Sequence, residues 1–234
     1  PVPLEEFDID DCINGLPRTI TGFWAKRLAG ALREGLGPVL VFAPHRKDAE
    51  RLARQFAREL PLADPLTLTA AQKQIAGPGL ARLLQHRIAF HHSGLSYGQR
   101  AGLIEPLAKA GQLRAVVGTL GLAAGINFSL RAVMVTASSY FVDRVERPIA
   151  PHDFLQMIGR AGRRGLDETG YVLVSGRTPR MRLATPQQLK RRCRGPFCCG
   201  VCRPANPLAM PWPMPPPTSS PKHRCGSATR RPHR

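Results

Sequence analysis

Acidic residues are missing from the last part of this 234-residue chain. After Glu168 there is no Asp or Glu, although residues 169–234 hold 13 of the 34 Lys and Arg residues. The formal net charge of +18 therefore divides into +13 for that segment and +5 for residues 1–168. Two stretches of different composition are joined, so the average charge describes neither of them.

Long apolar runs and cysteines are also scarce. No apolar run reaches the roughly 18–20 residues that a membrane-spanning helix needs, so we expect no membrane partner. Cys12 is the one cysteine in the first 192 residues, which argues against a secreted disulfide scaffold. No signal peptide opens the chain, so we expect an intracellular, cytoplasmic protein. The sequence begins with Pro1 rather than Met, which indicates a fragment or a trimmed chain.

Apolar runs of strand length alternate with stretches of helical periodicity. We expect strands at 39–43, 87–91, 113–117, 132–137 and 171–175. We expect helices at 46–60, 96–110 and 152–160, with Pro106 beginning, kinking or splitting the second, and a loop and one helix within 61–85. Because the strands are apolar on both faces and helices separate them, a doubly wound parallel α/β sheet is predicted.

Three segments follow from this pattern. Residues 1–36 are predicted to form an N-terminal linker and a first helix, and residues 37–185 the α/β domain. Residues 186–234 are rich in Pro, Arg and Cys, and such a chain cannot offset its ordering entropy by burying apolar surface. We therefore predict a disordered basic tail there.

The most informative stretch is QMIGRAGRRG at residues 156–165, which places three arginines among three glycines after a short helix. Glycines allow close backbone approach, and guanidinium groups match phosphate oxygens. The spacing is not a dinucleotide fingerprint, because a helix precedes it rather than a strand. On these residues alone, a phosphate site and a solvated basic loop both remain open.

Two further blocks follow predicted strands. The sequence TLGLAAGIN at 119–127 offers a hydroxyl and helix N-terminal amides to a phosphate, or a simple helix cap at Thr119. The sequence FHHSGL at 90–95 invites a metal interpretation. Adjacent residues of a strand point to opposite faces, however, so we expect His91 and His92 to pack rather than bind zinc, and we predict no metal site.

In this order and spacing, the blocks resemble the second RecA-like lobe of superfamily 2 helicases, closest to the DExH-box branch with the exosome-associated and archaeal repair helicases. The resemblance covers residues 1–185 and is most specific over 90–175. The family's last motif, Q-x-x-G-R-x-x-R, is matched by Gln156, Gly159, Arg160 and Arg163, and its branch-specific extension ends at Asp167. The other matches are T-x5-G-x-N/D at Thr119, Gly125 and Asn127, H-H-x-G-L at His91–Leu95 with Glu105 downstream, and the first motif at 39–49.

The resemblance implies a role for each matched residue. Arg163 would be the arginine finger that reaches the γ-phosphate, Arg160 a second phosphate or interlobe contact, and Gln156 an orienting group for water. The cofactor would be ATP with Mg²⁺, bound chiefly by an N-terminal RecA-like lobe. The nucleotide-facing residues would be Gly125, Asn127, Gly159, Arg160 and Arg163, and single-stranded RNA or DNA would contact Thr119, Pro44, Arg46 and His92.

The residues of a first lobe are missing. No Gly is followed by Lys, so the phosphate loop G-x-x-x-x-G-K-[S/T] is absent, and the one Asp-Glu pair, at 167–168, stands in the wrong context for a DExH box. The segment 128–130, Phe-Ser-Leu, also replaces a Leu-Pro-Ala-like sequence of the family. We expect half of an ATP-dependent helicase that is inactive alone; the alternative is a non-enzymatic, stand-alone lobe that binds nucleic acid.

The tail allows three interpretations. Cys199 and Cys202 have zinc-ligand spacing, which would make the chain a zinc-ribbon-tailed regulator. The arginines and prolines also suit an RNA-binding arm. Loss of all acids with gain of Arg, Pro, Cys and Gly is, however, what out-of-frame translation of GC-rich DNA produces, and the change falls near residues 188–191.

Overall fold

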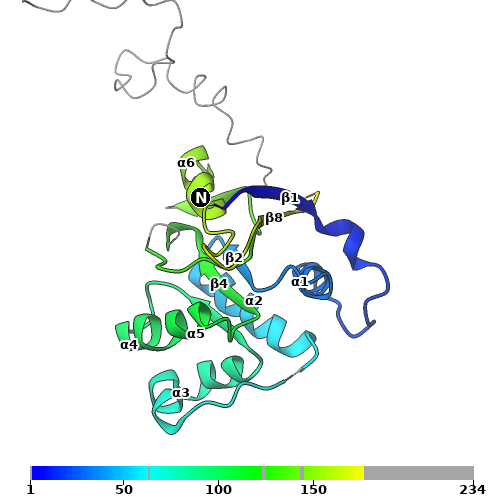
Figure 1. Ribbon diagram of the computed structural model, residues 1–234. Coiled ribbons are helices and arrows are strands. Elements are labelled where there is room, and N and C mark those ends of the chain that lie inside the picture. The colour runs from blue at the N-terminus through cyan, green and yellow to red at the C-terminus, as the bar shows by residue number, and fades with distance from the viewer. Residues whose placement is uncertain (1, 63, 123–124, 143–144, 177–234) are drawn as a thin grey trace, which may run out of the picture. The chain divides into compact units, whose positions relative to one another are not determined.

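The computed structural model describes residues 2–62, 64–122, 125–142 and 145–176 (Figure 1). The predictions of disorder, of zinc-ligand cysteines and of a frame change all concern the tail, which lies outside these residues. Within them, six strands form one parallel sheet. The order across the sheet is β1 (Leu4–Asp8), β8 (Gly170–Val174), β5 (Ala132–Val135), β2 (Val39–Ala43), β4 (Ala115–Thr119) and β3 (Ile88–His91).

The central strands carry the core because their side chains are apolar on both faces. All five residues of β2 are buried, as are all four of β5. The first residue of β2, Val39, pairs with Ala115 on one side and with Ala132 on the other. The predicted parallel α/β fold is therefore confirmed.

Helices cover this sheet. Their bounds are α1 Phe23–Arg33, α2 Arg46–Glu59, α3 Ala70–Gln85, α4 Tyr97–Gln99, α5 Glu105–Lys109 and α6 Pro151–Ile158. The apolar stripe of α2, with Phe56 fully buried, packs on β2, β3 and β4. In Figure 1, α3, α4 and α5 lie together; α3 packs on β3, and α6 packs on β5.

Predicted and observed elements differ by small shifts at most positions. The strand predicted at 113–117 is β4, two residues later, and the helix predicted at 152–160 is α6, which ends at Ile158. The helix predicted at 96–110 is divided into α4, the π-helical segment η2 (Arg100–Ile104) and α5. The wider π turn lies immediately before Pro106, whose ring and missing N–H disrupt a regular α-helix.

Other elements were not expected. Strand β1 extends the sheet, and the hairpin of β6 (Ser139–Val142) and β7 (Val145–Pro148) forms a separate antiparallel pair. The described residues also include the 3₁₀ turns η1 (Ile9–Ile13) and η3 (Leu120–Leu122). In the described part of the chain, no helix is both long enough and apolar enough to cross a membrane.

Candidate functional site

The carboxyl ends of three parallel strands meet at one edge of the sheet. Ala43 of β2 pairs with Thr119 of β4, and His91 of β3 pairs with the residue before Thr119. The residues that follow these strands are Pro44, Leu120 and His92, so they emerge side by side. This edge is where open α/β sheets bind ligands.

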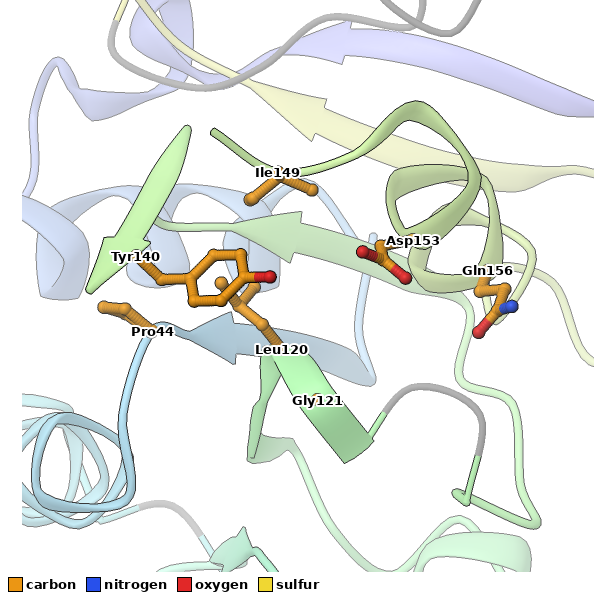
Figure 2. A pocket seen from close by; sticks show the side chains of 7 residues that line it. All are labelled: Pro44, Leu120, Gly121, Tyr140, Ile149, Asp153 and Gln156. Atoms are coloured by element: carbon orange, nitrogen blue, oxygen red, sulfur yellow. The ribbon is translucent and has the colours of Figure 1, made fainter. Parts of the chain in front are cut away.

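A pocket of about 260 Å³ opens at this edge (Figure 2). The lining joins the ends of β2 and β4 to the hairpin and to α6, and consists of Pro44, Leu120, Gly121, Tyr140, Ile149, Asp153 and Gln156. Pro44 and Gln156, which the sequence analysis assigned to separate motifs, thus line one pocket. Thr119 is half-buried at the end of β4, directly before η3.

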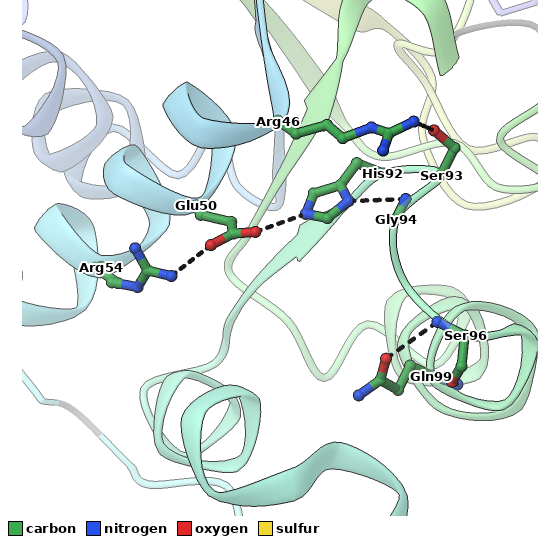
Figure 3. A network of polar contacts seen from close by, with 8 residues as sticks. All are labelled: Arg46, Glu50, Arg54, His92, Ser93, Gly94, Ser96 and Gln99. Carbon is green, nitrogen blue, oxygen red and sulfur yellow. Dashed lines mark hydrogen bonds and ion pairs between the residues drawn. The ribbon is translucent and has the colours of Figure 1, made fainter.

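Beside the pocket, Arg46 at the start of α2 contacts the loop after β3. Its Nη2 donates to Ser93 Oγ at 2.7 Å (Figure 3). His92 supports this loop from below: its Nδ1 accepts the Gly94 N–H at 3.1 Å, which leaves the proton on Nε2, 3.2 Å from Glu50 Oε1. His92 is 4% exposed, so this side chain holds the loop while Arg46 is exposed above it.

The neighbouring His91 is a core residue. It is 1% exposed, neither ring nitrogen has a hydrogen-bond partner within the described part of the chain, and Nε2 lies 3.5 Å from Glu105 Oε1. Burial lowers the pKa of His91, against an opposing effect of the Glu105 carboxylate. Among the described residues, no three His, Cys, Asp or Glu side chains are grouped so that they could hold a metal ion.

At its other end, α6 runs into the glycine-rich turn. This turn is joined to the segment before β5, because the Leu130 N–H donates to the Arg160 carbonyl at 3.1 Å and the Gly162 N–H donates to the Leu130 carbonyl at 2.8 Å. Gly125 and Asn127 are exposed on that same segment. Gly159, exposed, ends α6, and Arg160 is half-buried.

Arg163 is held by a carboxylate that the sequence analysis gave no role. Its Nε donates to Asp167 Oδ2 and its Nη2 donates to Asp167 Oδ1, both at 2.9 Å, and its backbone N–H donates to Oδ2 at 2.8 Å. The hydrogen bonds from Arg163 lower the pKa of Asp167, and the same pair raises the pKa of Arg163. The four-residue spacing inside a glycine-rich turn is the signal that could have identified this partner.

The predicted site residues therefore form two groups. Pro44, Arg46, His92, Thr119 and Gln156 belong to the carboxyl edge of the sheet, and Gly125, Asn127, Gly159, Arg160 and Arg163 to the joined turn and segment. α6 spans the distance between the two groups, with Gln156 in its last turn.

Comparison with known proteins accounts for this arrangement. The helicase conserved C-terminal domain model matches residues 25–165. The ATP-dependent DNA helicase Hel308 of Thermoplasma volcanium is 33% identical over 138 residues, covering 59% of this chain and 20% of that protein. The helicase POLQ-like protein of Drosophila melanogaster is 34% identical over 152 residues, covering 58% of this chain and 13% of that protein. The chain thus spans a fifth or less of these relatives, and it belongs to the helicase conserved C-terminal domain family as a superfamily 2 helicase lobe.

Proposed function

We propose that this chain is the second lobe of an ATP-dependent DNA helicase. It would supply arginines to ATP held on a separate N-terminal lobe and would contact one DNA strand along the carboxyl edge of its sheet. The observation that carries the proposal is the backbone pairing of Leu130 with the 160–162 turn, which brings two helicase motifs together at one site. Because a DNA helicase acts on nucleic acid inside the cell, we propose a cytoplasmic location for this chain.

On the nucleotide side, Arg163 would be the arginine finger and Arg160 a second phosphate contact. Gly125, Asn127 and Gly159 would line the approach to the nucleotide, and Gln156 would orient the attacking water. ATP and Mg²⁺ would bind chiefly to the other lobe. An arginine that enters the site when two lobes close stabilises charge on the transferred phosphoryl group, which is worth roughly 10³–10⁵ in rate in comparable enzymes.

On the nucleic-acid side, Arg46, Thr119 and Pro44 would follow the phosphate backbone. His92 would contribute by holding the loop that Arg46 contacts, since it is buried beneath it. DNA is favoured over RNA because the Thermoplasma volcanium relative is named a DNA helicase. Single-stranded RNA is the alternative that the experiment below distinguishes.

The nucleotide test combines the full chain with the part of the Thermoplasma volcanium relative that precedes its matched segment. We expect no ATP turnover by the chain alone and turnover stimulated by single-stranded DNA in the mixture. Arg163→Ala should lower that turnover by about 10³-fold or more, and Arg164→Ala, a neighbouring exposed arginine, should change it little. Turnover by the chain alone, or full activity of Arg163→Ala, would refute the proposal.

The strand test measures binding of fluorescent single-stranded DNA and RNA of equal length as salt is varied. Arg46→Ala should weaken binding and reduce the slope of log affinity against log salt by about 1, because one phosphate contact is lost. Arg82→Ala, which removes an exposed arginine on α3, is the matched control. If the chain binds RNA more tightly than DNA, the proposed substrate becomes RNA. If it binds DNA but DNA does not stimulate ATP turnover in the mixture, the non-enzymatic lobe is favoured.

A further inference from the structure

The contact between Arg163 and Asp167 is the most complete ion pair among the described residues. Both carboxylate oxygens are engaged, and three donors from a single arginine converge on them at 2.8–2.9 Å. The Asp167 side chain is 4% exposed and that of Arg163 is 22% exposed. A carboxylate this buried needs its partner, since removing one member of a buried pair leaves an uncompensated charge.

Backbone hydrogen bonds hold the short turn between the two residues. The N–H groups of Leu166 and Asp167 both donate to the Arg163 carbonyl at 3.0 Å, and Gly165 has a φ of +79°, which suits glycine. The Asp167 carboxylate therefore does not reach Arg163 from a flexible segment. It is delivered by the same turn that carries the arginine.

Arg131 lines the same pocket as this carboxylate. Its positive charge also lowers the pKa of Asp167, and its guanidinium carbon lies 5.8 Å from the centre of the Tyr171 ring. Arg131, Asp167 and Tyr171 line a polar pocket of about 310 Å³ that also includes Glu168. Asp167 thus feels the charge of two arginines, and it accepts hydrogen bonds from Arg163.

These contacts fix the Arg163 side chain and leave one guanidinium nitrogen, Nη1, outside the bonds to Asp167. Its backbone N–H and two of its guanidinium nitrogens are bonded to a single carboxylate, so the torsions between them are restrained. Among the described residues, Nη1 has no hydrogen-bond partner; it lies 3.7 Å from the point where Gly111 would carry a Cβ. Gly111, with a φ of +69°, leaves the space beside this nitrogen open.

We propose that Asp167 is a positioning residue for Arg163, which it holds in place before nucleotide arrives and whose Nη1 edge it leaves available for a phosphate oxygen. This inference rests on the proposed function of Arg163. An arginine already oriented avoids reorganisation at the moment of reaction, which is how fixed dipoles and charges stabilise a transition state. Asp167 would act on the rate only through Arg163, without touching the nucleotide.

The first test concerns the pair alone and uses the full chain. Exchange of the arginine Nε–Hε protons with water is measured by NMR, with the Arg163 signal assigned from its loss in Arg163→Lys. We expect slow exchange in the wild type and exchange about tenfold faster in Asp167→Asn, because the asparagine amide cannot accept both guanidinium bonds. Glu168→Gln, which changes the adjacent exposed carboxylate, should leave the signal unchanged. Equal exchange in wild type and Asp167→Asn would overturn the proposal.

The second test measures steady-state ATP turnover in the mixture with the N-terminal part of the relative. Asp167→Asn should lower kcat roughly 10–100-fold with little change in KM for ATP, since misplacing a catalytic group by about 1 Å can cost this much. Asp167→Glu should recover part of the loss. Arg163→Ala combined with Asp167→Asn should be no slower than Arg163→Ala alone, because the carboxylate acts through the arginine.

The outcomes separate the two proposals. If Arg163→Ala leaves turnover unchanged, the arginine-finger function fails, whatever the NMR result. If Arg163→Ala lowers turnover while Asp167→Asn keeps wild-type kcat, the positioning role fails and the finger survives. A rise in kcat for Asp167→Asn would also overturn the positioning role, since the carboxylate would then be restraining Arg163. Thermal unfolding of each variant shows whether the fold is retained.

Discussion

Replacing Gly170 by alanine is the sharpest test of the structure around the arginine turn. Gly170 begins β8, and a Cβ there would lie 2.6 Å from the Ala161 carbonyl carbon, 2.7 Å from the Ala161 oxygen and 2.7 Å from the Gly162 nitrogen. All three atoms belong to backbone, so no side-chain rotation relieves the overlap. The turn or the strand must move by about 1 Å, and overpacking of this kind costs about 2–3 kcal/mol of unfolding free energy.

The measurement is urea unfolding of the wild type and of Gly170→Ala, with Gly79→Ala as the control. Gly79 lies in the first turn after the break of α3 at Gly77, with nothing within 4 Å of its Cβ position, so alanine there should stabilise by about 0.4–1 kcal/mol by restricting the unfolded chain. The two glycine-to-alanine changes should therefore have opposite signs. An unchanged or increased unfolding free energy for Gly170→Ala would refute the close approach of β8 to the turn.

Three further predictions concern stability. The unfolding free energy should fall as the pH drops below about 6.5, because burial lowers the pKa of His91 in the folded protein, so that the unfolded chain binds a proton that the folded protein does not. In urea titrations at several pH values, His91→Gln should remove this dependence of the unfolding free energy on pH. Arg114→Ala should lower the unfolding free energy by about 1.5–3 kcal/mol in the same assay, since its guanidinium donates to the His86 and Pro61 carbonyls at 3.0 Å. A loss below about 0.5 kcal/mol, which is typical of substitutions at exposed sites, would contradict this. Phe56→Ala should cost about 3–5 kcal/mol through the cavity left in a fully buried position, and retention of the wild-type midpoint would contradict that packing.

The fold was predictable where buried elements have a recognisable pattern of apolar residues. Strands such as β2 are apolar at every position, and only a strand covered on both faces has that pattern. β1 has no such pattern, because Glu5 and Glu6 are exposed at the edge of the sheet. Its pairing with β8 joins Leu4 to Gly170, and no local propensity reports a contact so distant in sequence. In the hairpin, β7 likewise has all four residues on the surface.

The candidate site was predictable to the level of motifs and no further. The order of the glycines and arginines identified the family, which the comparison confirmed, and the roles of Arg160, Arg163 and Gln156 stay predictions. The four-residue spacing could have pointed to Asp167 as a partner of Arg163, but the contact of His92 with Glu50, 42 residues away, depends on three-dimensional neighbours. A histidine directly after a strand has the same local sequence whether its side chain accepts a hydrogen bond from its own loop or points to solvent.

The +18 charge would point to a nucleic-acid protein by itself, yet the arrangement that supports the proposal lies in the part of the chain that carries +5. There α6 packs against η3 at the pocket and against β5, and its eight residues span about 12 Å before the turn begins. The segment before β5 is tied to that turn through Leu130. If the strand contacts and the phosphate contacts act as proposed, we expect a shift of α6 at one group to displace the other, because the Gly159 N–H still donates to the Leu155 and Met157 carbonyls at the end of the helix. Sequence-independent attraction by a basic tail could raise affinity for any polyanion, but it has no means of relating a strand contact to a phosphate on ATP. That relation requires placed arginines and an element that joins two sites, and in the weakly charged domain we propose Arg160 and Arg163 for the first and α6 for the second.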